Sequence, residues 1–313
     1  MTDARPNPLT GILLKVCSVA VLMGLTSSIK ALGDSIPIGE MLFFRSFLAL
    51  IPIFVWLAWR GDFPRALHTN RPLGHVWRAL AGVCAMGLMF TALGLLPLTE
   101  VVAITYAAPL FITLFAALFL GERIRLYRMA AVALGFAGVL LVMLPRLTAF
   151  GDPAAGASEA LGALAALCAA VFMGLAQTFV RGLSKIETTA AIVFWFTLAS
   201  TLMTALTLPF AWVTPNTEQM LLLCTGGLAG GVGQILLTSS YRYAEAAVIA
   251  PFEYVSMVLA IAVGWFVFGE APTWLVISGA GLVTLAGILI IWRERQLGLK
   301  HDEARRARTP PFG

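Results

Sequence analysis

Very few ionisable side chains interrupt the long apolar runs of this chain, and they are the first candidates for chemistry. Every aspartate lies in a polar segment, whereas Glu253 lies inside an apolar run. If that run crosses a membrane, a charge near its centre costs on the order of 3 kcal/mol. We therefore expect Glu253 to bind a cationic group of a substrate or to take up a coupling proton. The alternative is a structural carboxylate that pairs with a neighbouring helix.

The residues around Glu253 favour a place in a cavity. Small and polar residues recur at the 3–4 spacing of one helical face. They are Ala246, Ala250, Glu253, Ser256, Met257, Ala260 and Gly264. Pro251 leaves the carbonyl of Ala247 without its helical donor, which predicts a helix break. Tyr254, next to the carboxylate, joins the candidate binding residues.

The fourth apolar run has a similar arrangement around Tyr106 and Pro109. Pro109 frees the carbonyl of Thr105. Tyr106 could stack on a ring-containing substrate or donate a hydrogen bond to it. A kink that only shapes helix packing is the alternative.

Two basic residues lie within apolar runs. Arg45 could receive a substrate carboxylate or phosphate in a bidentate contact. It could equally pair with Glu40 or Glu100, or extend its charge to the membrane surface. Lys15, near the start of the first run, is expected to be a snorkelling anchor.

Further polar candidates lie on other runs. Gly227 and Gly231 form a small-xxx-small face, which predicts close helix packing, and no phosphate-binding loop motif surrounds them. Gln234 and Tyr241 continue that face and could line a cavity, as could Gln177. Trp195 could stack on a substrate, although contact with lipid is the alternative.

The composition explains why these residues stand out. The chain has 313 residues, of which 59% are hydrophobic and only 12% charged. A soluble domain carries roughly a quarter charged residues, so the excess apolar surface requires lipid. Ten runs approach the roughly 20 residues of a helical span. They lie near 11–31, 38–59, 73–95, 98–120, 127–145, 159–180, 189–211, 219–241, 246–268 and 273–292. Backbone groups in lipid must be satisfied within their own segment, which predicts an all-α integral membrane protein.

The distribution of charge predicts the topology. Most of the 21 Lys and Arg residues, Arg78 among them, fall on the cytoplasmic side if the amino terminus is inside. This bias places both termini in the cytoplasm of a cell with an inner membrane. The basic residues behind the net charge of +5 thus fix the topology, and we expect no nucleic-acid partner. The four cysteines lie singly in different runs, which predicts neither a metal site nor disulfides.

Short motifs recur between the two halves of the chain. Gly121-Glu122 after the fourth run recurs as Gly269-Glu270 after the ninth, and Ala137-Gly138-Val139-Leu140 recurs as Ala286-Gly287-Ile288-Leu289. Five spans per half would insert the halves in opposite directions, which is typical of alternating-access carriers. The expected organisation is a cytoplasmic amino terminus (1–10), a first repeat (11–145), a periplasmic linker (146–158), a second repeat (159–292) and a basic cytoplasmic tail (293–313).

Three motifs carry a family resemblance. They are Phe43-Phe44-Arg45, then Pro109 followed by Gly121-Glu122-Arg123, and Ala250-Pro251-Phe252-Glu253-Tyr254 leading to Phe268-Gly269-Glu270. With the repeat, they resemble the EamA branch of the drug/metabolite transporter superfamily over nearly the whole chain. The resemblance implies a ten-helix basket around a central cavity, without ATP hydrolysis or a cofactor. The Pro-Phe-Glu-Tyr sequence looks most like the proteobacterial subgroup that includes riboflavin and S-adenosylmethionine uptake carriers.

The expected function is uptake of a ring-containing vitamin or nucleoside-like compound, with riboflavin first and S-adenosylmethionine second, by a monomer or homodimer. Export of amino acids, metallophores or drugs is the alternative. A membrane-embedded enzyme is disfavoured because His68, His75 and His301 lie in a loop, at a span edge and in the tail. Acyl transfer within a membrane would need an intramembrane base. A channel is disfavoured because pores are usually rings of subunits with fewer spans.

Overall fold

The computed structural model describes residues 8–61, 63–120, 126–148, 156–183, 186–210, 212–243 and 249–308. Every regular element in these residues is a helix, as the apolar runs predict. The long helices are α1 (Pro8–Leu32), α2 (Ile38–Arg60), α4 (Pro72–Leu95), α6 (Ala108–Leu120), α7 (Leu126–Thr148), α8 (Gly156–Leu183), α9 (Thr189–Ala205), α10 (Thr217–Tyr243), α12 (Val255–Phe266) and α13 (Trp274–Arg308). The short elements are α3 (Phe63–Leu67), α5 (Leu98–Thr105) and the 3-10 turns η1 (Gly33–Ser35), η3 (Leu208–Phe210) and η4 (Ala250–Tyr254).

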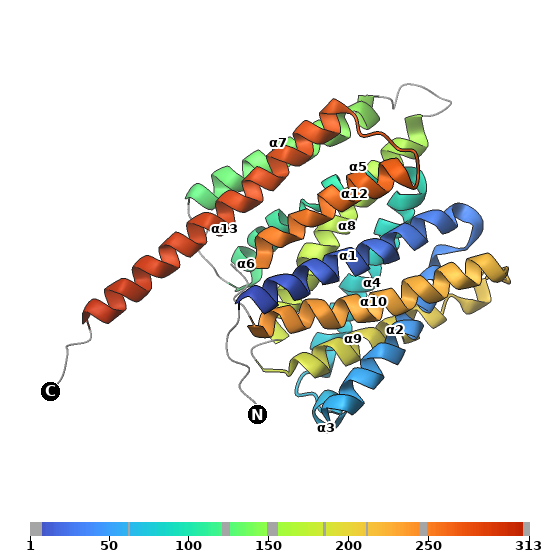
Figure 1. Cartoon of the computed structure of the whole chain (residues 1–313), viewed down its shortest axis with the longest axis horizontal. Helices are drawn as coiled ribbons and strands as arrows, with labels where there is room; N and C mark the ends of the chain where they lie inside the picture. Colours follow the sequence, from blue (N-terminus) through green and yellow to red (C-terminus); the bar gives the residue numbers. More distant parts are fainter. Residues whose placement is uncertain are drawn as a thin grey trace.

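The helices form one bundle (Figure 1). Many large apolar side chains on them are exposed. Within the described residues, eight helices are long and apolar enough to cross a membrane, and the apolar helices Phe252–Phe266 and Trp274–Leu289 are shorter. Large apolar side chains such as Trp59, Phe266 and Trp274 are at least 84% exposed. Exposed apolar surface on this scale indicates contact with lipid. The chain is therefore a multi-pass membrane protein, and the count of ten spans stays a prediction.

Some sequence predictions fall outside the described residues. These are most of the amino terminus and of the linker, the Gly121-Glu122-Arg123 motif, Ala246, Ala247 and the last residues of the tail. In the rest of the predicted tail, α13 continues as a helix through Arg308. Figure 1 shows α13 lying beside α7 and extending past it, away from the other helices.

Glycines allow α10 to approach α1 and α2 closely. A Cβ atom on Gly227 would lie 2.9 Å from the carbonyl oxygen of Phe44, and one on Gly231 would lie 2.7 Å from that of Ala49. The predicted small-residue face of this helix is thus confirmed as a packing surface. We call the end of the bundle that carries η1 the η1 end, and the opposite end, which carries α3, the α3 end.

Two interruptions meet inside the bundle. Between α5 and α6, the turn at Tyr106 and Ala107 immediately precedes the helix that contains Pro109. Before α12, Pro251 lies in the 3-10 turn η4. Glu253 is therefore on a tighter turn than the α-helix that the sequence predicts, because a prolyl residue cannot donate to the preceding turn.

Candidate functional site

An ion pair within the bundle joins segments that are far apart in sequence. Nζ of Lys15, on α1, contacts Oε2 of Glu253, in η4. The Lys15 side chain is 3% exposed, whereas that of Glu253 is 51% exposed. The predicted snorkelling role of Lys15 is wrong, because a carboxylate inside the bundle holds its ammonium group. Glu253 remains accessible to a cation or a proton from its open side.

Tyr106 connects this ion pair to the interrupted helix. Its Oη atom lies 2.5 Å from Oγ of Ser256, and Ser256 donates a hydrogen bond of 2.7 Å to the carbonyl of Glu253. The ring of Tyr254 packs edge-to-face on that of Tyr106, with 5.2 Å between the centroids. The structure thus brings together Glu253, Tyr254 and Tyr106, which the sequence placed in different halves. Two aromatic rings and a carboxylate next to a helix break can bind a ring that carries a positive charge.

Two arginines form a second polar region. Arg45 lies on α2, and its Nε atom is buried without a hydrogen-bond partner. Arg78 lies within α4 and is 8% exposed, so its assignment to the membrane surface is wrong. Its guanidinium carbon lies 3.9 Å from the ring centroid of Phe196, which holds the charge in the interior by a cation–π contact.

The pairings considered for Arg45 go to other residues. Glu100 accepts hydrogen bonds of 2.7 and 3.0 Å from Arg146, which also pairs with Glu159. Glu40 accepts a 3.1 Å hydrogen bond from the backbone of Val213. Pairing of Arg45 with Glu40 or Glu100 is therefore wrong, since both carboxylates are occupied near the η1 end.

Trp195 is partly buried on α9. Its Nε1 atom is buried without a hydrogen-bond partner, and its ring is 6.4 Å from that of His75. His75 lies in the first turn of α4, at the span edge where the sequence placed it, and is 2% exposed. A Glu187 oxygen lies 3.9 Å from its Nε2 atom, too far for a hydrogen bond.

The other predicted residues are dispersed. Gln234 is half-buried on α10, Gln177 is exposed on α8, and the side chain of Tyr241 lies outside the described residues. In the described part of the chain, no group of His, Cys, Asp or Glu could hold a metal ion.

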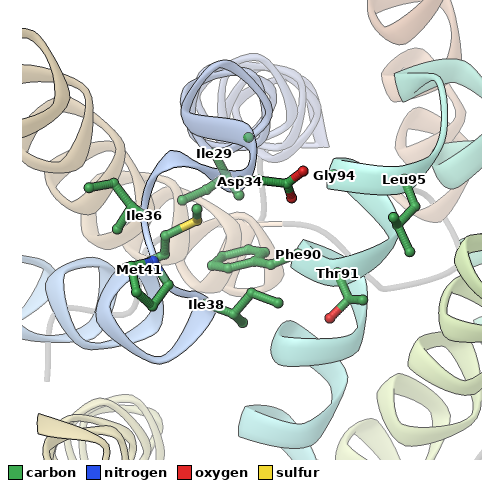
Figure 2. A pocket seen from close by; sticks show the side chains of 11 residues that line it. Ile29, Asp34, Ile36, Ile38, Met41, Phe90, Thr91, Gly94 and Leu95 are labelled. Atoms are coloured by element: carbon green, nitrogen blue, oxygen red, sulfur yellow. The ribbon is translucent and has the colours of Figure 1, made fainter. Parts of the chain in front are cut away.

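A separate cavity of about 260 Å³ opens at the η1 end. Figure 2 shows Phe90 at its centre, with Ile29, Ile36, Ile38 and Met41 around it. Asp34 supplies one carboxylate at its edge. This cavity contains none of the residues singled out from the sequence, and its lining is mainly apolar. The charged residues deeper in the bundle are therefore the candidate site.

Comparison with known proteins identifies the family. The profile of the EamA-like transporter family matches residues 9–144 and 160–293, which is most of the chain. The chain belongs to this family. Members of the EamA-like transporter family among its relatives are named as transporters, so the protein is a transporter and not an enzyme.

Individual relatives of this EamA-like chain differ in what they carry. A riboflavin transporter of Rhizobium johnstonii is 29% identical over 78% of this chain and 76% of its own. An S-adenosylmethionine uptake transporter of Rickettsia prowazekii is 26% identical over 96% of this chain and 99% of its own. A pseudopaline exporter of Pseudomonas aeruginosa is 28% identical over 90% of this chain and 95% of its own. A crystal structure with 21% identity covers 90% of this chain and 97% of its own with a TM-score of 0.64, which shows the EamA-like fold alone.

Sequence reasoning missed two residues of the candidate site, Lys15 and Arg78. Both lie about two helical turns inside a span, at a depth where a basic side chain can also reach the membrane surface. The available signal was their spacing on the helix: Lys15 shares a face with buried Ser18 and Val19, and Arg78 with buried His75 and Gly82. A charge on the buried face of its helix points away from lipid.

Proposed function

We propose that the protein is a secondary transporter that moves a small organic metabolite across the inner membrane by alternating access. In this proposal the α3 end and both termini face the cytoplasm, and two inverted five-span repeats surround the transport path, in a monomer or a homodimer. The observation that carries the proposal is the Lys15–Glu253 pair, in which a buried ammonium group is held by a half-exposed carboxylate.

The pair supplies a means of coupling binding to movement. A proton or a cationic substrate group that reaches Glu253 competes with Lys15 for the carboxylate. Weakening the pair removes a contact between α1 and η4, two segments that pack together in this structure. A ligand shifts a conformational equilibrium only through different affinities for the two states, and this competition provides the difference.

For the substrate, we propose a ring-containing vitamin or nucleoside-like compound that is taken up, with riboflavin first and S-adenosylmethionine second. The relatives named for these two compounds support the order. Tyr106 and Tyr254 next to Glu253 offer rings on which a flavin or an adenine could stack.

Export is the second candidate function. A relative named as a pseudopaline exporter matches nearly the whole chain, at an identity similar to that of the uptake carriers. Since the same helices serve either direction, amino acids, metallophores or drugs carried outward are the alternative substrates.

Counterflow in proteoliposomes tests the proposed function. Vesicles loaded with unlabelled riboflavin or S-adenosylmethionine should accumulate the labelled compound, and Glu253→Gln should lower the initial rate by about ten-fold or more, the loss expected for one charge-assisted contact. Glu218→Gln, at an exposed site on α10, is the control that should transport normally. Unchanged transport by Glu253→Gln at normal expression would reject the role of this carboxylate.

Direction is tested in cells. Expression in a riboflavin auxotroph that lacks its own uptake system should restore growth on a low external supply of riboflavin. Failure to rescue, together with faster loss of preloaded compound from the cells, would favour export.

A further inference from the structure

Most of the unpartnered polar atoms belong to residues on three helices that pack against one another, α2, α4 and α9. Among the described residues, nine buried side-chain nitrogen and oxygen atoms have no hydrogen-bond partner, and eight of these come from these three helices. They come from Arg45, Ser46, His75, Arg78, Trp195 and Ser200. Buried polar atoms in native proteins are nearly always paired, so this concentration requires a physical explanation.

The unpaired atoms are chiefly hydrogen-bond donors. The guanidinium groups and the indole can only donate, while the two hydroxyl groups and the imidazole can donate or accept. The group that would satisfy them must therefore be an acceptor with several lone pairs. A carboxylate or a phosphate group has this property, and it also carries the charge that two cations require.

The protein's own carboxylates do not meet this requirement. The intramembrane and span-end acids whose contacts are described each have another partner. Glu40 accepts from Val213, Glu100 and Glu159 pair with Arg146, Glu187 accepts from Thr69, Asn70 and Arg71, Glu253 pairs with Lys15, and Glu270 pairs with Lys30. Arg45 and Arg78 thus lack a counter-ion in the described part of the chain.

The two arginines lie on different helices, each nearer to an opposite end of the bundle. Arg45 lies about 10 Å along α2 from the η1 end, and Arg78 about 9 Å along α4 from the α3 end, at 1.5 Å per residue. Nη1 of Arg78 extends one turn deeper, where a Cβ atom on Gly82 would lie only 2.6 Å from it. Nε of Arg45 lies beside α10, where a Cβ atom on Gly230 would be 3.6 Å from it. Two like charges in a low dielectric repel strongly, and an anion between them would reverse the sign of that interaction.

We propose that Arg45 of α2 and Arg78 of α4 form an anion-binding site, which receives a carboxylate or phosphate group of the transported solute. This inference rests on the proposed function, which it narrows to solutes that carry an oxyanion. Of the two substrates named above, S-adenosylmethionine has a carboxylate and riboflavin has none, so the anion site favours S-adenosylmethionine over riboflavin. Glu253 and the two arginines would then contact opposite charges of one zwitterionic solute.

Phosphate is the probe for the test, because it presents the oxyanion without the rest of a solute. The thermal unfolding midpoint of the purified full chain in detergent is titrated with sodium phosphate against sodium chloride at matched ionic strength. The variants are Arg45→Gln, Arg78→Gln and Arg78→Lys. Arg60→Gln is the control, because it removes an exposed arginine from the same helix as Arg45.

We expect phosphate to raise the midpoint of the wild type and of Arg60→Gln. The apparent phosphate affinity of Arg45→Gln and Arg78→Gln should fall by about ten-fold or more, the loss of one charge-assisted contact. Without phosphate, both should unfold at the wild-type temperature or higher, because each removes an unpaired buried cation. Arg78→Lys should keep part of the affinity, since it keeps the charge but loses the bidentate fork.

An equal phosphate response in Arg78→Gln and wild type, or no response in wild type, would overturn the site. Stabilisation by phosphatidylglycerol but not by phosphate would also overturn it, because the arginines would then bind a lipid headgroup. Counterflow separates this proposal from the proposed function. If riboflavin is transported but phosphate has no effect on the unfolding midpoint, the transport function stands and the anion site is wrong. If phosphate raises the midpoint in an Arg78-dependent way but no solute is exchanged, the anion site stands and the transport function is wrong.

Discussion

Nζ of Lys30 lies 2.8 Å from Oε1 of Glu270, and the pair closes around the turn between α4 and α5. Lys30 donates a 2.9 Å hydrogen bond to the carbonyl of Leu96, and the backbone amide of Leu98 donates one of 2.8 Å to Glu270. The lysine side chain is 10% exposed and the glutamate 23%. At the η1 end, therefore, the last turn of α1 and the segment after α12 contact each other directly, and both also bind the backbone of the turn between α4 and α5.

The strength of this contact can be measured with a double-mutant cycle. Because both side chains are partly buried and share backbone partners, Lys30→Gln and Glu270→Gln should show a coupling energy of about 0.5–3 kcal/mol. The readout is the free energy of unfolding in detergent. Glu218→Gln combined with Lys30→Gln should be additive, because Glu218 is exposed on α10. Additivity of the Lys30 and Glu270 changes would show that the pair contributes nothing to stability.

The two side chains of the Lys15–Glu253 pair are unequally buried, so substituting one or the other should change the free energy of unfolding by different amounts. Glu253→Gln leaves an ammonium group 3% exposed without a counter-ion, and should destabilise the fold by about 3 kcal/mol. Lys15→Met leaves a half-exposed carboxylate that water can solvate, so its cost should be smaller. The double variant should recover most of the stability lost in Glu253→Gln. Equal losses in the two single variants would contradict the burial that this argument uses.

Much of the fold could be predicted because the governing forces are local to each segment. Apolar runs in lipid must be helices, and they match α1, α2, α4 and α8 to within a few residues. Small residues at a spacing of four predicted the contact of Gly227 and Gly231 with α2. Pro251 predicted a break in the helix, but not the 3-10 geometry of the turn there, because the helical periodicity continues through this segment.

The candidate site was harder to predict because it depends on partners distant in sequence. Glu253 stood out as a lone acid in an apolar run, but Lys15 lies 238 positions away and no local pattern joins them. Arg78 was assigned to the membrane surface from its closeness to a span end. Its position on the face of Phe196 depends on how α4 and α9 pack, which single-helix patterns do not specify.

Two glycines of α13 provide a matched test of helix packing in the α7–α13 pair. A Cβ atom on Gly279 would lie 2.6 Å from the carbonyl oxygen of Gly138, whereas one on Gly281 would meet no atom within 4 Å. Gly279→Ala should therefore destabilise the fold by about 1–3 kcal/mol, because backbone atoms cannot move away cheaply. Gly281→Ala should be neutral or stabilising, since alanine is the better helix former. The thermal unfolding midpoints of the two variants test this difference in stability. Equal midpoints would contradict the close contact between α7 and α13 at Gly279.

Acid sensitivity is expected from Glu187, which lies in the turn between α8 and α9, outside the spans. Its Oε1 atom accepts hydrogen bonds from the backbone amides of Asn70 (2.6 Å) and Arg71 (3.0 Å) and from the hydroxyl of Thr69 (3.0 Å). Burial alone would raise the pKa of this carboxyl, but the hydrogen bonds and the neighbouring His75 outweigh it, and the pKa is lowered from its ordinary value of 4.5. The ionised form therefore ties the start of α4 to the α8–α9 turn.

The sign of the pH effect follows from this lowered pKa. Since the folded chain holds the Glu187 proton less tightly than the unfolded chain, acid favours unfolding. The contribution of Glu187 should be complete above pH of about 5 and should be lost as the pH falls through the folded-state pKa. The unfolding midpoint of Glu187→Gln should thus lie below that of the wild type at pH 7, and the gap should shrink in acid. Hydrogen bonds to an ionised carboxylate weaken once the carboxylate is protonated. If the difference between the two midpoints stayed constant down to pH of about 3, the hydrogen bonds to Glu187 would not depend on its charge, and the prediction would be wrong.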